Sequence, residues 1–321
     1  MSASPEQTVV VTGAAGFIGS HLVQRLLAAG CRVRGVDSFT ELYSDERKKA
    51  NLKVAMGNPL FEFHEIDVGD PVRFPPLLEG SSLCFHLAAE AGVRSSWGSS
   101  FSRYVDRNIL ATQRLLDAAT ACDTLRRVVT ASSSSVYGDA TSFPTKESEA
   151  TIPRSPYGVT KLASERLADA YAANWHVPTV SLRFFTVFGP RQRPDMAFHR
   201  LIEAALRGEP FPLYGAGDQI RDFTYVDDAV EALLASASTE VPNGSVFNVS
   251  GGGETTLLEA ITEIERLTRT TIALDRQDVA AGDARRTGGD ITAARRWLGW
   301  SPRVGVNEGL ARQVAWHVQL R

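Results

Sequence analysis

The chain has 321 residues, of which 43% are hydrophobic, and its 34 basic and 37 acidic side chains leave a formal net charge of −3. This length suits one large core or two unequal lobes that share a cleft. The slightly acidic balance gives no electrostatic reason to expect nucleic acid or an anionic membrane as a partner.

Signals for membrane insertion or export are not expected from this sequence. Its longest apolar runs stay below the roughly 18 residues of a membrane span, and residues 1–8 lack the basic start and apolar core of a signal peptide. Cys31, Cys84 and Cys122 are widely separated, without metal-like or disulfide-like spacing. Unpaired thiols suit a reducing compartment, so we expect a cytoplasmic protein.

Short β-branched runs alternate with helical patterns in the first half of the chain. Buried strands are predicted at residues 8–12, 32–37, 60–66, 83–87, 127–131 and 179–183. Helices are predicted at residues 20–29, 101–121 and 157–174. This alternation predicts an α/β fold, a doubly wound parallel sheet of the Rossmann type with helices on both faces.

The alternation ends near residue 184, where prolines begin to punctuate the sequence. Later helices are predicted at residues 197–207, 292–298 and 306–317. Strands predicted at residues 223–226 and 245–249 are expected to return to the parallel sheet.

This pattern predicts two domains. A Rossmann domain spans residues 1–184, with the later strands near 223–249 returning to it, and a smaller lobe spans mainly residues 185–321. Ligands of open parallel sheets sit at the carboxyl ends of the strands, so we expect the substrate in the cleft between the two domains.

Three glycines, Gly13, Gly16 and Gly19, follow the first predicted strand. Glycine lets the backbone turn sharply and approach a pyrophosphate closely. The helix after the turn offers free N–H groups and a positive dipole end to the phosphates. The spacing therefore predicts a dinucleotide site, with Phe17 and Ile18 among its contacts.

Asp37 ends the second predicted strand, 18 residues after Gly19. A carboxylate there accepts both ribose hydroxyls and repels a 2′-phosphate, which favours NAD over NADP. An aspartate that only caps the next loop is the alternative. Asp67 ends the third predicted strand, and we expect it at the adenine edge.

Tyr157 and Lys161 form a Y-x-x-x-K pattern at the start of a predicted helix. Residues four apart share a helix face, so the Lys161 ammonium is expected beside the Tyr157 phenol. That ammonium and the positive ring of NAD⁺ would lower the phenol pKa from about 10. The pair would then take a hydroxyl proton while hydride leaves the same carbon. A surface pair is the alternative.

Four consecutive serines, Ser132, Ser133, Ser134 and Ser135, follow the strand predicted at residues 127–131. A hydroxyl at a strand's carboxyl end can bond the reacting alcohol and relay its proton to the tyrosine. Ser133 and Ser134 are the candidates for this catalytic role. A polar loop is the alternative.

The chain resembles the extended short-chain dehydrogenase/reductase superfamily and its nucleotide-sugar epimerases and dehydratases. The matching pieces are Asp37 and the stretches TGAAGFIGSHL (12–22), HLAA (86–89), SSSVYG (133–138), SPYGVTK (155–161) and RDFTYVDD (221–228). The resemblance implies an NAD domain, a C-terminal lobe for a sugar nucleotide, and a homodimer built on two helices per subunit. It also implies cofactor contacts at Val68, Leu87, Ala88, Ala89 and Ser132.

Two further stretches of the sequence narrow the choice of reaction within this superfamily. GVRSSWG (92–98) and FTVFGPRQRPDMAFHRLI (185–202) resemble UDP-glucuronic acid 4-epimerases. Related 4,6-dehydratases carry an Asp-Glu pair, and UDP-glucuronate decarboxylases a Glu, where this chain has Ser134 and Ser135. Without an acid there, elimination and decarboxylation lose their proton carrier. We therefore expect NAD-dependent epimerisation of UDP-glucuronic acid to UDP-galacturonic acid through a 4-keto intermediate.

That intermediate is a β-keto acid, which sheds CO₂ when its carboxylate bond stands perpendicular to the ketone plane. An epimerase must therefore fix the carboxylate in another orientation. By resemblance, the residues that clamp it are Ser133, Ser134, Ser135, Thr186 and Arg193. A guanidinium fork suits a carboxylate.

Two further arginines are implied by the resemblance to bind substrate. Arg94 would contact the pyrophosphate or the sugar acid, and Arg221 the UDP pyrophosphate. A structural arginine that bridges the lobes is the alternative for either. The six histidines show no ligand spacing, so no metal is expected.

Three other functions remain open from the sequence. The chain could be a UDP-glucose/UDP-galactose 4-epimerase or a UDP-glucuronate decarboxylase, and Arg193 with the hydroxyl cluster favours an acid substrate over a neutral one. It could also be a non-catalytic sensor of NAD or a nucleotide sugar. The intact Ser134, Tyr157 and Lys161 argue against a sensor, which needs no tuned phenol.

Overall fold

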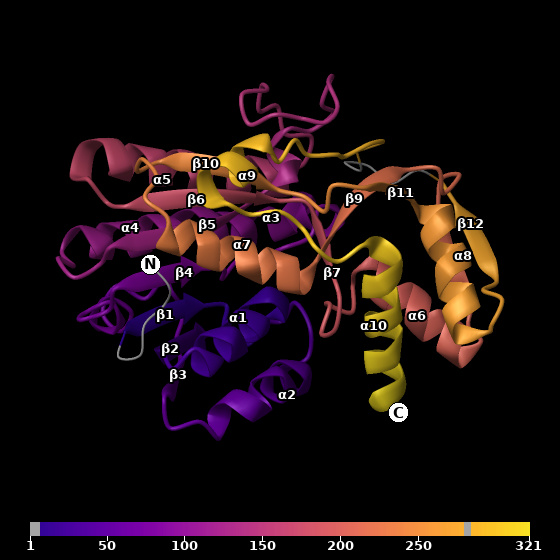
Figure 1. The fold of residues 1–321 in the computed structure, drawn as a ribbon, viewed down its shortest axis with the longest axis horizontal. Helices are drawn as coiled ribbons and strands as arrows, with labels where there is room; N and C mark the ends of the chain where they lie inside the picture. The colour runs from indigo at the N-terminus through magenta and orange to yellow at the C-terminus, as the bar shows by residue number, and fades with distance from the viewer. Residues whose placement is uncertain (1–6, 279–283) are drawn as a thin grey trace.

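The computed structural model describes residues 7–278 and 284–321 (Figure 1). Its centre is a seven-stranded sheet with the order β10-β6-β5-β4-β1-β2-β3, in which every pair is parallel. The strands are β1 (Thr8–Thr12), β2 (Arg32–Asp37), β3 (Phe61–Glu65), β4 (Leu83–His86), β5 (Arg127–Ser133), β6 (Thr179–Phe184) and β10 (Ser245–Val249). This arrangement confirms the predicted α/β fold.

Helices cover both faces of this sheet because its strands are apolar on both. Val9 and Val11 of β1 pack into a core shared with α1 and α7, whereas Val10 packs into a second core shared with α4 and α5. Alternate strand residues face opposite sides, so each side needs its own apolar cover. These helices are α1 (Phe17–Ala28), α4 (Ala111–Thr120), α5 (Pro156–Trp175) and α7 (Val226–Ser238).

Several predicted helices differ from the observed ones. α1 starts at Phe17 instead of residue 20, because Gly16 is already its extended N-cap. The helix predicted at 101–121 is interrupted, because α3 (Phe101–Tyr104) and α4 are joined by the π-helical turn Val105–Leu110. Helix α2 (Asp45–Met56) was not predicted, because its charged sequence buries few side chains and shows no clear apolar stripe.

The smaller lobe corrects one predicted strand. β9 (Ile220–Tyr225) does not return to the large sheet. It lies between β7 (Thr186–Phe188) and β11 (Glu254–Thr256) in a three-stranded sheet. β6 already pairs with β5 on one edge and β10 on the other, so β9 pairs instead with β7, which continues the chain beyond β6. Only the strand predicted at residues 245–249 rejoins the large sheet.

The remaining elements complete the smaller lobe and the chain end (Figure 1). They are α6 (Ala197–Arg207), β8 (Phe211–Tyr214), α8 (Leu257–Thr268), β12 (Leu274–Gln277), α9 (Thr292–Leu298) and α10 (Val306–Gln319). β8 and β12 pair in parallel as a two-stranded sheet. Within residues 7–278 and 284–321, every helix is too short or too polar to span a membrane.

Candidate active site

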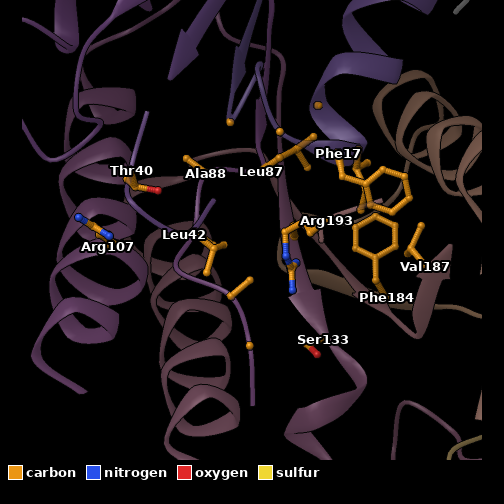
Figure 2. Close-up of a pocket in the computed structure, with 18 of the residues that line it drawn as sticks. Phe17, Thr40, Leu42, Leu87, Ala88, Arg107, Ser133, Phe184, Val187 and Arg193 are labelled. Atoms are coloured by element: carbon orange, nitrogen blue, oxygen red, sulfur yellow. The ribbon is translucent and has the colours of Figure 1, made fainter. Parts of the chain in front are cut away.

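A cavity of about 370 Å³ opens at the carboxyl ends of the large sheet (Figure 2). The predicted residues that line it are Gly13, Gly16, Phe17, Ile18, Gly19, Asp37, Asp67, Val68, Leu87, Ala88, Ala89, Ser132, Ser133, Ser134, Ser135, Tyr157, Lys161, Thr186 and Arg193. The structure therefore gathers almost every residue predicted from the sequence around one cavity, as expected for a parallel sheet.

The glycine turn lies so close to β4 that side chains do not fit. Gly13 has φ +68°, and a Cβ on it would lie 2.8 Å from the Ala88 nitrogen. A Cβ on Gly19 would lie 2.0 Å from the Gly13 oxygen. The first turn of α1 has no side-chain cap and no acidic residue among the described residues, so its N–H groups remain available to an anion. This turn fits a dinucleotide pyrophosphate.

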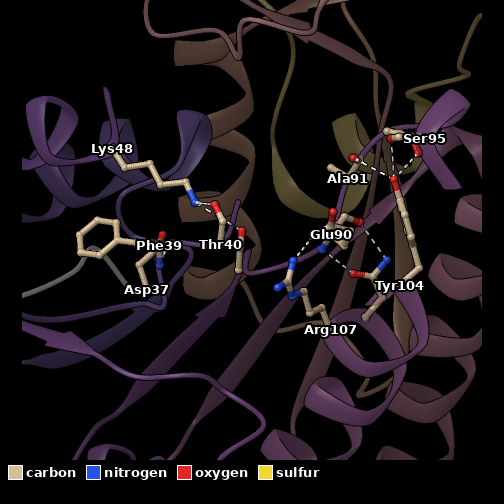
Figure 3. Close-up of polar contacts among 11 residues, drawn as sticks. Asp37, Phe39, Thr40, Lys48, Glu90, Ala91, Ser95, Tyr104 and Arg107 are labelled. Atoms are coloured by element: carbon tan, nitrogen blue, oxygen red, sulfur yellow. Dashed lines mark hydrogen bonds and ion pairs between the residues drawn. The ribbon is translucent and has the colours of Figure 1, made fainter. Parts of the chain in front are cut away.

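Asp37 stands at the end of β2, and Figure 3 shows it beside Phe39. Two backbone N–H groups hold its carboxylate. It accepts hydrogen bonds from the Ala15 nitrogen at 3.1 Å and the Phe39 nitrogen at 3.0 Å. Burial raises the pKa of this carboxyl, while the charge of Lys48 and these N–H groups act against the rise. Each carboxylate oxygen still has room for a second donor, as a ribose site requires. Asp67 accepts from the Gly69 nitrogen at 2.7 Å.

Tyr157 and Lys161 lie on the first turns of α5, which Ser155 caps by accepting from the Gly158 nitrogen at 3.1 Å. The Lys161 Nζ donates to the Ala131 carbonyl at 2.7 Å. Burial lowers the pKa of Lys161 to about 8, so the amine is still mostly charged at neutral pH.

The pKa of Tyr157 is one correction to the sequence analysis. We predicted that the Lys161 ammonium lowers it, but in the chain by itself burial raises the Tyr157 pKa. The groups that act against this rise are the Ser133 hydroxyl, by hydrogen bonding, and the Arg193 charge. The Lys161 ammonium donates to the Ala131 carbonyl, and the groups that support the phenolate come from other elements.

The serines of the run Ser132–Ser135 all line the cavity, and some of their hydroxyls also support the protein structure. β5 continues through Ser133, two residues past its predicted end. The Ser132 hydroxyl donates to Glu165 at 2.8 Å, and Glu165 forms a buried ion pair with Arg183 at 2.6 Å. Ser133 accepts from the Ser135 nitrogen at 3.1 Å, which starts a 3-10 turn. Ser132 therefore anchors the strand through its hydroxyl, although it also lines the cavity.

The three predicted substrate arginines are placed differently. Arg193 lines the cavity and forms a two-point ion pair with Asp195, with both N···O distances at 3.0 Å. Arg94 is outside the cavity lining, with its guanidinium 4.2 Å above the ring of Tyr214. Arg221 is also outside it, and donates to the carbonyl of Ile220 at 2.9 Å.

Comparison with known proteins identifies a family whose name agrees with a dinucleotide site of this kind. Residues 9–250 match the NAD dependent epimerase/dehydratase family. The chain belongs to this family.

Relatives of this family member align over nearly their whole length. The protein named "Uncharacterized UDP-glucose epimerase YtcB" of Bacillus subtilis (strain 168) is 40% identical, over 96% of this chain and 97% of its own. A UDP-glucuronate 4-epimerase of Thermodesulfobacterium geofontis (strain OPF15) is 34% identical, over 96% and 95%. The crystal structure of the Bacillus cereus UDP-glucuronic acid 4-epimerase with UDP-glucuronic acid and NAD superimposes with a TM-score of 0.95 at 40% identity, covering 98% and 100%.

The cavity of this family member also contains residues that the sequence analysis missed. Thr40, Leu42 and Tyr43 reach it from the loop after β2, and Lys48 from α2. The Tyr43 hydroxyl is buried and has no hydrogen-bond partner among the described residues. Lys48 donates to the Thr40 carbonyl, as Figure 3 shows. No spacing rule marks these positions, because an unpredicted loop and helix bring them to the site.

Arg107 is a further missed residue of the cavity lining. It comes from the π-helical turn and pairs with the buried Glu90 at 2.6 Å (Figure 3). Asn108 of the same turn donates to the Glu90 carbonyl at 3.0 Å and to the Thr160 hydroxyl at 2.9 Å. The turn thereby ties the end of β4 to α5, and a sequence pattern that predicts one regular helix does not reveal it.

His199, Glu203 and His317 form a cluster with metal-ligand character, since one ligand atom of each lies within 4.8 Å of the others. Arg47 donates to Nε2 of His199 at 2.9 Å, so Nδ1 of this ring donates to the Gln192 carbonyl at 2.9 Å. No lone pair of His199 is left for an ion. We interpret the cluster as a hydrogen-bonded link between α2, α6 and α10.

Proposed function

We propose that the chain catalyses the NAD-dependent epimerisation of UDP-glucuronic acid to UDP-galacturonic acid at C4. The observation that carries this proposal is the composition of the sugar end of the cavity. Ser133, Ser134, Tyr157, Thr186 and Arg193 supply hydroxyls and one guanidinium there.

The acids of the cavity lie elsewhere. Among the described lining residues, the carboxylates are Asp37 and Asp67, which end strand β2 and follow strand β3. Both lie on the side of the glycine turn and the predicted ribose site. No lining carboxyl therefore stands beside the serines to carry a proton to or from C5, which disfavours dehydration and decarboxylation.

The chain's own residues account for the proton steps. Tyr157 takes the proton of the C4 hydroxyl and later returns it, with Ser133 or Ser134 as the relay. When bound, NAD supplies the acceptor and donor of the C4 hydride. Ser133 and Arg193 stabilise the phenolate form of Tyr157 against its burial, and the Lys161 ammonium lines the same cavity. Rotation of the 4-keto sugar between the two transfers inverts C4.

The names of the relatives support UDP-glucuronic acid as the substrate, and one of them supports UDP-glucose as an alternative. The relatives named UDP-glucuronate 4-epimerase and the structure holding UDP-glucuronic acid favour the uronic acid. The Bacillus subtilis relative is named as a UDP-glucose epimerase, which keeps UDP-glucose as the second candidate substrate. Arg193 decides for the acid in our proposal, because a neutral sugar leaves its guanidinium without an anionic partner from the ligand. We also propose that Arg94 contacts the substrate, since it directly follows the lining residues Gly92 and Val93.

The test is incubation of the purified chain with UDP-glucuronic acid or UDP-glucose in parallel, without added NAD, followed by NMR of the products. We expect UDP-galacturonic acid, because the cofactor is regenerated within each turnover and can stay bound. Conversion of UDP-glucose alone would overturn the choice of substrate. CO₂ as the main product would replace the epimerase with a decarboxylase.

We further propose a cytoplasmic homodimer. Phe101, Leu110 and Val159 are 37%, 41% and 47% exposed on the two helical segments expected to form the interface. All three cysteines are free thiols, two of them buried, which suits a reducing compartment. Light scattering should give twice the mass of one chain, and the double substitution of Leu110→Glu and Val159→Glu should give the monomer mass. A monomer in the unaltered chain would contradict the dimer.

A further inference from the structure

The Arg193 side chain is paired with Asp195, two residues later in the chain. Its Nε donates to one oxygen of Asp195 and its Nη2 to the other, both at 3.0 Å. Pro194 stands between the two residues and restricts the backbone. The Met196 nitrogen donates to the Arg193 carbonyl at 3.1 Å, and α6 begins at the next residue. The pair therefore sits on a turn that a proline and a helix start both stiffen.

The two partners differ in their position relative to the cavity. Arg193 lines the cavity, whereas Asp195 is absent from the described residues of the lining and its side chain is 43% exposed. Asp195 occupies the edge of the guanidinium formed by Nε and Nη2, so the end with Nη1 stays available. In Figure 2 the guanidinium of Arg193 points toward Ser133. The Nη1 end, which Asp195 does not occupy, is thus directed toward Ser133.

We propose that Asp195 is a positioning residue that locks this guanidinium so that it holds the substrate carboxylate away from the geometry of CO₂ loss. This inference rests on the proposed function. A long arginine side chain has several rotamers, and an unsupported fork would let the carboxylate turn. Two-point pairing removes that freedom. Asp195 acts through Arg193 and does not touch the substrate.

The reaction that Asp195 suppresses starts from the 4-keto uronic acid. The bond between C5 and the carboxylate carbon breaks, CO₂ leaves, and the electron pair moves onto C5 and the C4 ketone oxygen as an enolate. A proton from solvent at C5 gives a 4-keto pentose. Return of the hydride to C4 then gives a UDP-pentose, whereas early release of the ketone leaves the cofactor reduced. No additional oxidant is needed, because hydride removal from C4 is the first step of the epimerisation.

The charges of Arg193 and Asp195 also shift the pKa of each other's side chain. Asp195 raises the pKa of Arg193, and Arg193 lowers the pKa of Asp195 against the effect of burial. The pair is therefore charged on both sides at neutral pH. Asparagine at this position keeps the size of the side chain but removes the negative charge and replaces one acceptor oxygen with an NH₂ donor, which is the change the test requires.

The experiment compares the unaltered holoenzyme with Asp195→Asn on UDP-glucuronic acid, and measures UDP-galacturonic acid, CO₂ and reduced cofactor in the same reaction. We expect the CO₂ released per epimerisation to rise about tenfold or more, since small misplacements of reacting groups change rates by such factors. Asp195→Glu, which keeps the carboxylate, should leak less CO₂ than Asp195→Asn.

Glu254→Gln is the matched control. Glu254 pairs with the same guanidinium edge of Arg286, accepting from Nε at 2.9 Å and Nη2 at 2.8 Å, and lies outside the cavity lining. It should leave the product ratio unchanged. If Asp195→Asn only lowers KM, the aspartate competes with the substrate and our proposal is wrong. The proposal is also overturned if both Asp195 variants keep the unaltered ratio of CO₂ to UDP-galacturonic acid. It is overturned as well if a variant releases extra CO₂ only at temperatures where it begins to unfold.

The unaltered enzyme distinguishes a failure of the proposed function from a failure of the role of Asp195. If it forms no UDP-galacturonic acid, the proposed function has failed, whatever the variants do. If it forms UDP-galacturonic acid and the variants release no extra CO₂, only the role of Asp195 has failed.

Discussion

The cavity has two walls that are built on different principles. One wall, made of the glycine turn and the end of β4, presents mainly backbone and small side chains such as Gly13, Gly16 and Ala88. We propose that it holds the nucleotide and call it the nucleotide wall. The other wall, made of the serine run, α5 and the segment after β6, presents polar side chains such as Tyr157 and Arg193. We propose that it holds the sugar and call it the sugar wall. A backbone site depends on local chain geometry, whereas a side-chain site depends on elements that meet only in the folded protein.

The supports of the two walls differ in the same way. Thr12, His86 and Thr112 form an uncharged chain of hydrogen bonds, 2.9 and 3.0 Å long, behind the nucleotide wall. The sugar wall is supported by ion pairs, above all the buried pair of Glu165 and Arg183. The uncharged bonds hold the nucleotide wall at little electrostatic cost, and the ion pair of Arg107 and Glu90 beyond β4 adds charged support to the same wall.

Tyr157→Phe should have the largest effect, because it removes the general base proposed to take and return the C4 hydroxyl proton. We expect kcat for epimerisation to fall by about 10³-fold, with an unchanged melting temperature. Tyr171→Phe is the control on the same helix, where the hydroxyl bonds Gln113 and Asp117 on the side away from the cavity. A rate within tenfold of the unaltered enzyme would remove Tyr157 from the mechanism.

Gly19→Ala tests whether the nucleotide wall tolerates any side chain. Its Cβ would lie 2.0 Å from the Gly13 oxygen, so the turn must shift. Overpacking of this kind costs about 1–3 kcal/mol of unfolding free energy, and we expect bound NAD to be lost as well. Gly305→Ala is the control, because no atom lies within 4 Å of its added Cβ and its φ is −70°. Retention of NAD by Gly19→Ala would show that the turn is not built for phosphate.

His86 should make the nucleotide wall sensitive to acid. Burial lowers its pKa from 6.5 to about 3, so between these values the unfolded chain binds a proton that the folded chain does not. Stability contributed by His86 is therefore present above pH 6.5 and lost as the pH falls toward 3.

Urea unfolding of the unaltered chain and His86→Gln checks this dependence. The unaltered chain should lose about 2 kcal/mol more than the variant between pH 7 and pH 5. The exposed His176 provides the control, and His176→Asn should follow the unaltered chain. Parallel curves for the unaltered chain and His86→Gln would contradict the assigned role of burial.

Tyr43→Phe should have the smallest effect on stability, and it tests which of the two walls the Tyr43 hydroxyl belongs to. The Tyr43 hydroxyl is buried without a partner among the described residues, so its removal should change the free energy of unfolding by less than about 1 kcal/mol. Affinity for NAD or for the UDP-sugar should fall, because a bound ligand offers the missing partner. Calorimetry with each ligand shows which wall the hydroxyl serves, and unchanged affinity for both would exclude a ligand contact.

Sequence patterns predicted most of the sheet and the residues that line the cavity. The glycine spacing, Asp37 at the end of β2, and the Y-x-x-x-K pattern are local, so each could be recognised without the rest of the fold. The strand predicted at residues 223–226 was misassigned to the large sheet, because strand pairing depends on which edges are already occupied. Tyr43 and Arg107 were missed because an unpredicted loop and a π-helical turn carry them.

The sequence by itself determined where the chain turns, which segments are buried, and which residue types reach the carboxyl ends of the strands. These features follow from steric limits and periodicity over a few residues. Only the tertiary structure decided that Lys161 bonds the Ala131 carbonyl, that Ser133 and Arg193 support the Tyr157 phenolate, and that Asp195 stands behind the arginine. The electrostatic state of a buried group depends on every charge and dipole around it, and most of these come from distant parts of the chain.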